Sequence, residues 1–329
     1  MFLDIILITI GFVLLILGAN VLIEGASNIA KKLNIPEMLI GLSIVAIGTS
    51  LPELIITITS ASKGTSDLII GNAIGSNICN LLLILGIVSI IKPIKVDKEA
   101  KKIHIPILVI VTCIILLIAT GVIGISENEI DKSTGTLLLI MFISYFIYPI
   151  IKEINNIKKN YKENKDKKNI NLILSFLYIV IGIIFLKYGG DFVVNNSISI
   201  AKIWGISEEI IGLTIVAFGT SLPELVTSVV AIIKGDEDLA IGNLIGSCIF
   251  NLLLILGVGA IITTLEFSYQ SNQNLALLAI VTLLIWIFNY IGKKKYITRT
   301  KGIILLLVFI GYTINLFKWG NKWTDIFTK

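Results

Sequence analysis

The chain contains the stretch AIGTSLPEL at residues 46–54 and a near copy, AFGTSLPEL, at residues 217–225. The two copies are 171 positions apart, and each places one glutamate, Glu53 or Glu224, inside a long apolar segment. An ionised carboxylate at membrane depth is expensive, so such a residue is rarely kept there without a role and a partner. The repeat therefore predicts two functional carboxylates within a membrane domain.

Composition indicates an integral membrane protein. Of the 329 residues, 55% are hydrophobic and 15% charged, and the mean hydropathy is +0.94. Apolar segments of about 20 residues are long enough to cross a bilayer as helices. The ten predicted spans are 3–23, 37–62, 68–91, 103–125, 134–151, 171–190, 207–233, 238–263, 274–292 and 302–318.

Lysine distribution predicts the orientation in the cell membrane. If the N-terminus is outside, most lysines fall in cytoplasmic loops, and the lysine-rich segment 152–170 becomes a cytoplasmic linker. The lysines lie in short loops without interleaved aromatic residues, so the net charge of +5 indicates topology rather than nucleic-acid binding. The first residues, Met1 to Asp4, lack the basic start of a signal peptide, so the first span is expected to be retained.

A second pair of stretches extends the repeat. GNAIGS at 71–76 matches GNLIGS at 242–247, and NLLLILG recurs at 80–86 and 251–257, always 171 positions apart. Five spans in each copy is an odd number, so the second copy enters the membrane from the opposite side. The expected fold is all-α, with ten transmembrane helices in two inverted-topology repeats of five, over residues 1–151 and 171–329.

The prolines of the repeated motif predict broken helices. Pro52 has no N–H, so the carbonyl of Gly48 loses its helical partner, and Pro223 has the same effect on Gly219. Irregular backbone at membrane depth is tolerated where it is buried in protein or lines a cavity. Carbonyls of the 46–49 turn are therefore expected to face such a cavity.

Oxygen-bearing side chains recur at helical spacing beside the glutamates. Residues four apart share one face of a helix, which places Thr49 with Glu53 and Thr220 with Glu224 if the helix continues through the proline bend. The following spans carry two further stripes: Asn72, Ser76 and Asn80, and Asn243, Ser247 and Asn251. Beside these stripes, Gly71 with Gly75 and Gly242 with Gly246 form GxxxG pairs, which allow close helix packing.

This set of carboxylate, amide, hydroxyl and carbonyl oxygens suits a hard cation such as Ca²⁺ or Na⁺ and is poorly suited to zinc or copper. Two bidentate glutamates and two carbonyls from the Thr49 and Thr220 turns would give Ca²⁺ about six oxygens. Several Na⁺ ions could instead use Ser50, Ser76, Ser221, Ser247 and the Asn amides, in competition for the glutamates. Competition for shared ligands is a physical basis for exchange.

The two GTSLPE segments, each followed by GNxIGSxxxN, resemble the paired alpha-repeats of the sodium/calcium exchangers of the cation/calcium antiporter superfamily. The resemblance covers nearly the whole chain. It implies a ten-helix inverted repeat that exchanges Na⁺ for Ca²⁺ electrogenically, by alternating access, with ions bound at the midplane. By this resemblance Glu53, Glu224, Thr49 and Thr220 fall on Ca²⁺ ligands. By the same resemblance, the positions that help bind Na⁺ are Ser50, Ser76, Ser221, Ser247 and the carbonyls of Ala46 and Ala217.

One position departs from part of the family. Some members carry Asp where this chain has Asn251, opposite Asn80, so this chain has one titratable group fewer. A K⁺-dependent Na⁺/Ca²⁺ antiporter and an H⁺/Ca²⁺ antiporter are the alternatives within the superfamily. The H⁺/Ca²⁺ branch usually has GNxxE where this chain reads GTSLPE, which counts against it.

Other interpretations of these residues are simpler. Asn80 and Asn251 either contact the ion or only form hydrogen bonds between helices. Asn72 and Asn243 could only brace the bend. Thr57 and Ser228 are expected to pack against neighbouring helices rather than to bind the ion. His104 is expected to be a solvated residue at a span entrance. The cysteines Cys79, Cys113 and Cys248 lie in apolar runs without metal-ligand spacing and are expected to be inert.

Two other classes of function fit the sequence less well than an antiporter. An intramembrane enzyme would need a Ser–His pair, paired Asp residues or HExxH within the spans, and the sequence has none of these. A passive channel would not need two broken-helix repeats of opposite orientation. The sequence predicts no cofactor: the expected partners are Na⁺, Ca²⁺ and the bilayer, and a monomer suffices.

Overall fold

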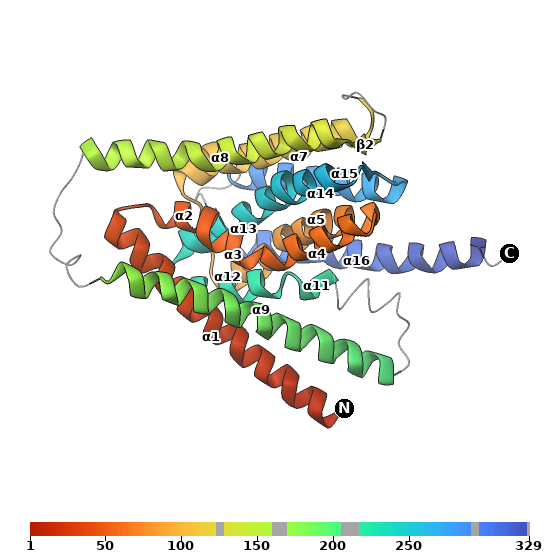
Figure 1. The fold of residues 1–329 in the computed structure, drawn as a ribbon, viewed down its shortest axis with the longest axis horizontal. Helices are drawn as coiled ribbons and strands as arrows, with labels where there is room; N and C mark the ends of the chain where they lie inside the picture. Colours follow the sequence, from red (N-terminus) through yellow and green to blue (C-terminus); the bar gives the residue numbers. More distant parts are fainter. Residues whose placement is uncertain (123–127, 160–169, 205–216, 291–295, 328–329) are drawn as a thin grey trace.

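The computed structural model describes residues 1–122, 128–159, 170–204, 217–290 and 296–327, which are almost entirely helical (Figure 1). Within a bilayer a helix satisfies every backbone polar group internally, which favours this outcome for apolar sequences. The α-helices are α1 (Phe2–Leu33), α2 (Glu37–Ile40), α3 (Ala46–Thr49), α4 (Leu51–Ser62), α5 (Ser66–Ile78), α6 (Leu85–Ile91), α7 (Ile105–Ala119), α8 (Lys132–Lys159), α9 (Leu172–Ile203), α11 (Ala217–Gly219), α12 (Leu222–Lys234), α13 (Glu237–Phe250), α14 (Leu256–Ile262), α15 (Tyr269–Phe288) and α16 (Arg299–Phe327). Short π-helical and strand elements connect them: η1 (Gly41–Val45), η2 (Cys79–Ile84), η3 (Ala100–His104), η6 (Asn251–Ile255), β1 (Ile94–Lys95), β2 (Glu129–Ile130), β3 (Leu265–Glu266) and β4 (Tyr296–Ile297).

The helices identify a multi-pass membrane protein. Seven helical segments of the described chain are long and apolar enough to cross a bilayer, and an eighth is formed if the bent pair Glu37–Thr49 and Leu51–Ser62 is one span. Every predicted span overlaps helical residues. The part of the seventh span at 207–216, like the span ends at 123–125 and 291–292, lies outside the described residues.

Several helices are longer than hydropathy predicted. Helices α1 and α9 continue to Leu33 and Ile203, well past the predicted span ends at 23 and 190, and α8 continues past 151 to Lys159. Hydropathy detects only the apolar part of a helix, whereas the helix itself ends at a local stop signal. For α1 this signal is Asn34, in the left-handed conformation with φ of 57°.

Helices α1 and α9 pack side by side and antiparallel through glycines (Figure 1). A Cβ atom added at Gly11 would lie 2.8 Å from the carbonyl oxygen of Gly189, and one at Gly18 would lie 2.9 Å from that of Gly182. Residues 11 and 182, and likewise 18 and 189, are 171 positions apart. Gly11 therefore packs against the repeat equivalent of Gly18, and Gly18 packs against the repeat equivalent of Gly11, so the contact is reciprocal.

The strands show the same exchange between the two halves of the chain. Strand β1 pairs antiparallel with β4, and β2 pairs antiparallel with β3. Strands β1 and β3 occupy equivalent positions, 171 residues apart. Each half therefore pairs its own strand with one from the other half.

The second GxxxG pair fixes α13 against the segment that contains the first repeated motif. A Cβ atom at Gly242 would lie 2.5 Å from the carbonyl oxygen of Met38, and one at Gly246 would press on the carbonyl oxygen of Leu42 and lie 2.7 Å from Cβ of Ala46. The predicted close approach is confirmed at this pair. It brings α13 beside η1 and α3, near the centre of the molecule (Figure 1). The same prediction was wrong for Gly71 and Gly75, where no described atom lies within 4 Å of an added Cβ.

The expectation for His104 was wrong. Its side chain is only 4% exposed, and its Nδ1 lies 2.8 Å from the hydroxyl of Tyr145 in α8. The two rings also meet edge to face, with centroids 5.8 Å apart. Sequence position next to lysines indicated a solvated residue, but α8 covers this turn of η3.

We expect Gly246→Ala to lower the apparent Tm of the detergent-purified protein. Alanine gains about 0.5–1 kcal/mol of helix stability over glycine, but overpacking a tight contact costs about 1–3 kcal/mol, and here the new methyl meets backbone atoms. The matched control is Gly311→Ala in α16, where no described atom lies within 4 Å of the added Cβ. Thermal unfolding should show a lower Tm for the first variant only, and equal Tm values would contradict the packing described here.

Candidate functional site

Both glutamates lie in the first turn of a helix that follows a break. Ser50 separates α3 from α4 with φ of −89° and ψ of 10°, and Ser221 precedes α12 with φ of −86° and ψ of 4°. Pro52 and Pro223 follow as the second residues of α4 and α12, where a missing N–H costs nothing. The helix dipole favours negative charge in a first turn. The repeated motif thus builds the same bend twice.

Glu53 and Glu224 are each 1% exposed and are the only acidic side chains among the buried polar residues of the described chain. No lysine or arginine of that part is buried, and neither glutamate forms an ion pair there. The two carboxyl groups belong to one cluster, because Ser50, three residues before Glu53, contacts Glu224. Buried charges in proteins are normally paired or bind a metal ion. The two glutamates have no positively charged partner in the described chain.

Hydroxyl groups from both halves contact the two carboxylates. Ser50 Oγ donates to Glu224 Oε1 at 2.9 Å, although the two residues belong to different copies of the motif. Ser76 Oγ lies 3.4 Å from Glu53 Oε1, and Ser247 Oγ lies 3.5 Å from Glu224 Oε1. The structure therefore gathers the serines around the glutamates.

Thr49 connects the bend to α13. Its Oγ1 lies 3.1 Å from Asn243 Oδ1, 3.4 Å from Ser247 Oγ and 3.3 Å from the carbonyl oxygen of Ala46. The Ala46 carbonyl also accepts the backbone N–H of Ser50 at 3.0 Å. The expected free carbonyl is therefore not found at Ala46, because the helix continues through α3 as far as Thr49.

Several buried oxygens beside these groups have no hydrogen-bond partner in the described chain. Most buried polar atoms in proteins are paired, so each exception needs an explanation. Carboxylate and amide oxygens can only accept, and what they lack is a donor or a cation. These oxygens are Glu53 Oε2, Glu224 Oε2, Asn80 Oδ1, Asn251 Oδ1 and Ser221 Oγ.

The remaining predicted residues have mixed roles. Asn72 Nδ2 donates to the backbone carbonyl of Glu53 at 3.2 Å, which supports the bracing interpretation. Asn243 Nδ2 donates to Ser228 Oγ at 3.2 Å while its oxygen faces Thr49. Thr220 is partly buried between α11 and α12. Ala217 begins α11, directly after a gap in the described residues, and Thr57 is buried without a partner for its hydroxyl in the described chain.

Sequence reasoning missed Asn77. This residue is 0% exposed; its Nδ2 donates to the backbone carbonyl of Cys248 at 3.1 Å, and its Oδ1 accepts from Asn251 Nδ2 at 3.0 Å. Recurrence in both copies was the criterion for candidate residues, and the position equivalent to 77 is a cysteine, Cys248. Its place beside Ser76 was the signal that could have found it.

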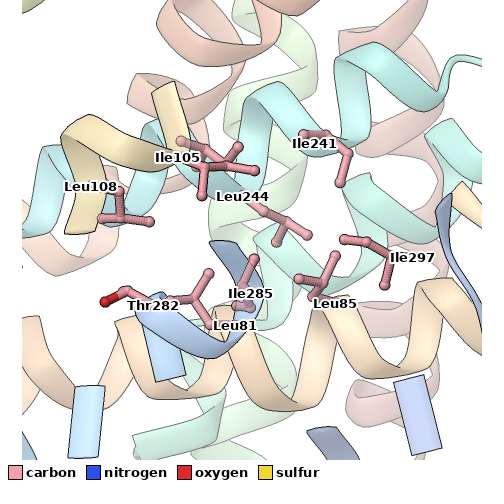
Figure 2. A pocket seen from close by; sticks show the side chains of 10 residues that line it. Leu81, Leu85, Ile105, Leu108, Ile241, Leu244, Thr282, Ile285 and Ile297 are labelled. Carbon is pink, nitrogen blue, oxygen red and sulfur yellow. The ribbon is translucent and has the colours of Figure 1, made fainter. Parts of the chain in front are cut away.

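A cavity in the described part of the molecule adjoins the repeated motif, and another lies away from it. One of about 210 Å³ lies between α9 and the α3–α4 bend, and Thr49, Pro52, Pro223 and Lys187 line it. The other, of about 20 Å³, is shown in Figure 2 and has an almost wholly apolar lining, with no glutamate. Because the first cavity contacts the residue before each glutamate, it adjoins the site.

The family model described as "Sodium/calcium exchanger protein" matches residues 3–151 and, separately, residues 174–318. The chain belongs to this family. The exchanger family is a family of transporters rather than of enzymes, and the match covers both copies of the repeated motif.

Similar proteins agree with the family assignment. This exchanger-family chain is 36% identical over 326 residues to CaxA of Alkalimonas amylolytica, covering 95% of this chain and 98% of CaxA. It is 31% identical to "Sodium/calcium exchanger MaX1" of Methanosarcina acetivorans, covering 94% and 97%. A solved structure of the sodium-calcium exchanger NCX_Mj superposes with a TM-score of 0.81 at 33% identity, covering 94% of this chain and 97% of that one.

In the ion-free protein, Ser50 and Ser221 are expected to contribute differently to thermal stability. Ser50→Ala removes a charge-assisted hydrogen bond to Glu224, worth about 1.5–3 kcal/mol, whereas Ser221 Oγ has no partner to lose in the described chain. Thermal unfolding in sodium-free and calcium-free buffer should show a lower Tm for Ser50→Ala than for Ser221→Ala. Equal Tm values would mean that the Ser50–Glu224 contact contributes nothing.

Proposed function

We propose that this protein is a secondary antiporter that exchanges Na⁺ for Ca²⁺ across the membrane and binds both ions between Glu53 and Glu224. One observation carries the proposal: the two buried carboxylates have no basic partner in the described chain, and the Oε2 atom of each has no hydrogen-bond partner there. A cation supplies the missing charge and the missing partner at once. The names of MaX1 and NCX_Mj as sodium/calcium exchangers support this choice of ions.

The proposed ligands divide by charge. Two carboxylates balance one divalent ion, so Ca²⁺ uses the glutamates with the two threonine turns, whereas Na⁺ ions use neutral oxygens and compete for the same glutamates. The proposed Ca²⁺ ligands are Glu53, Glu224, Thr49 and Thr220. The proposed Na⁺ ligands are Ser50, Ser76, Ser221, Ser247, Asn80, Asn251 and the carbonyl of Ala217. The Ala46 carbonyl is left out because it already accepts two hydrogen bonds.

The proposed architecture has ten spans in two inverted repeats, 1–151 and 171–329, joined by a cytoplasmic linker at 152–170. The antiparallel and reciprocal packing of α1 against α9 supports it, because these helices begin the two repeats. The cavity beside α9 is the proposed entry route, since it adjoins both prolines of the bends. Alternating access then requires α9 to close or open this route.

Orientation can be tested by thiol labelling in intact cells. With the N-terminus outside the plasma membrane, a cysteine at Lys63, between α4 and α5, is exposed to the exterior, and one at Lys98, after β1, is exposed to the cytoplasm. A membrane-impermeant maleimide should label Lys63→Cys before lysis and Lys98→Cys only after it. The reverse pattern would overturn the proposed topology.

Glu53→Gln and Glu224→Gln are each expected to abolish transport. Each change leaves a divalent ion with one countercharge, and breaking a buried charge pair costs about 3–5 kcal/mol, which is at least about a hundredfold in affinity. The measurement is radiocalcium uptake into proteoliposomes driven by an outward Na⁺ gradient, with K⁺ and pH varied separately to test the K⁺- and H⁺-coupled alternatives.

The matched control for this experiment is Glu24→Gln, which changes an exposed glutamate of α1 and should leave uptake unchanged. Uptake that survives either site substitution would reject the assigned site. Calcium flux that saturates poorly and does not need Na⁺ on the opposite side would indicate a channel instead.

A further inference from the structure

Asn77 lies where the two halves of the molecule meet. It belongs to α5, and both of its hydrogen bonds reach residues of the second half, the carbonyl of Cys248 at 3.1 Å and the amide of Asn251 at 3.0 Å. Residues 77 and 248 are 171 positions apart, so Asn77 contacts its own repeat equivalent. No sequence repeat identifies this residue, and the ligands proposed above do not include it.

The Asn77 amide can adopt only one orientation. A backbone carbonyl accepts hydrogen bonds and never donates them, so the atom facing the Cys248 carbonyl must be the amide nitrogen of Asn77. That carbonyl lies at the junction of α13 and η6, where it also receives the backbone N–H of Asn251. The oxygen of Asn77 is therefore directed at the side chain of Asn251.

The orientation of Asn251 follows from this. An oxygen of Asn77 can only accept, so Asn251 must present its nitrogen to Asn77 and its oxygen in the other direction. That oxygen, Oδ1, is buried and has no hydrogen-bond partner in the described chain. Asn251 stands four residues after Ser247, which contacts Glu224, so both lie on one face of the helix.

We propose that Asn77 is a positioning residue that locks the Asn251 amide with its oxygen toward the cation. This inference rests on the proposed function and extends it, because it explains how a neutral amide, which could turn either its nitrogen or its oxygen to the site, becomes a dependable oxygen ligand. A reversed amide would direct an N–H group at the ion. Asn77 acts only through Asn251 and does not contact the ion.

The first half of the chain lacks this device. The position that would orient Asn80 in the same way is occupied by Cys248, whose thiol is a weak hydrogen-bonding group. The two asparagines are therefore unequal, and Asn251 is the one with a fixed orientation. The difference predicts that substitution at residue 77 affects ion binding through residue 251 alone.

The test measures the Na⁺ dependence of Na⁺-driven Ca²⁺ uptake in proteoliposomes for Asn77→Leu. Loss of one oriented Na⁺ ligand is expected to raise KM for Na⁺ about tenfold, with a change in maximal rate below about threefold. The same substitution is then made in an Asn251→Asp background. A carboxylate presents an oxygen whichever way it turns, so in that background Asn77→Leu should change KM by less than about threefold.

The matched control is Asn289→Leu, which removes a buried asparagine at the end of α15 and should leave KM unchanged. If Asn77→Leu does not fold, the smaller Asn77→Val replaces it in both backgrounds. An equal change of KM in both backgrounds, or none in either, overturns the positioning role. Absence of Na⁺-driven uptake in the unsubstituted protein would instead overturn the proposed function.

Discussion

Two carboxylates that share a low-dielectric interior repel each other, and each loses its hydration, so the fold must provide compensation nearby. In this protein the described residues provide hydroxyls, amides and helix N-termini around Glu53 and Glu224, but no basic side chain. Partial compensation of this kind is costly in a purely structural element. It suits a site that binds a cation reversibly, as proposed above.

The exact placement of these carboxylates depends on contacts that cross between the two halves. Ser50 of the first motif donates to Glu224 of the second, and Thr49 contacts Asn243 and Ser247. Close approach at Gly242 and Gly246 makes these contacts possible, because a side chain there would separate α13 from the first motif. Glycines between α1 and α9 allow the same close approach of these two helices. Small residues thus allow the helices to pack closely, and polar residues form the contacts between them.

Sequence patterns predicted the features that occur twice. Glu53, Glu224, the bends at Pro52 and Pro223 and the apolar spans were all predicted from recurrence and hydropathy, and the structure has them as buried carboxylates, helix breaks and long helices. Helix ends were less predictable, since Asn34 and similar stop signals lie beyond the apolar segment. His104 was predicted wrongly because its burial depends on α8, which is distant in sequence.

Asn77 was missed for a different reason: its proposed role comes from a departure from the repeat. A perfectly repeated chain would have the same residue at 77 and 248, and the two asparagines that follow would have equivalent surroundings. Here an amide at 77 meets the backbone of Cys248, while the equivalent side chain is a thiol. An ion between two equivalent halves would be held equally by both, whereas unequal halves allow one side to retain its ligand geometry while the other rearranges.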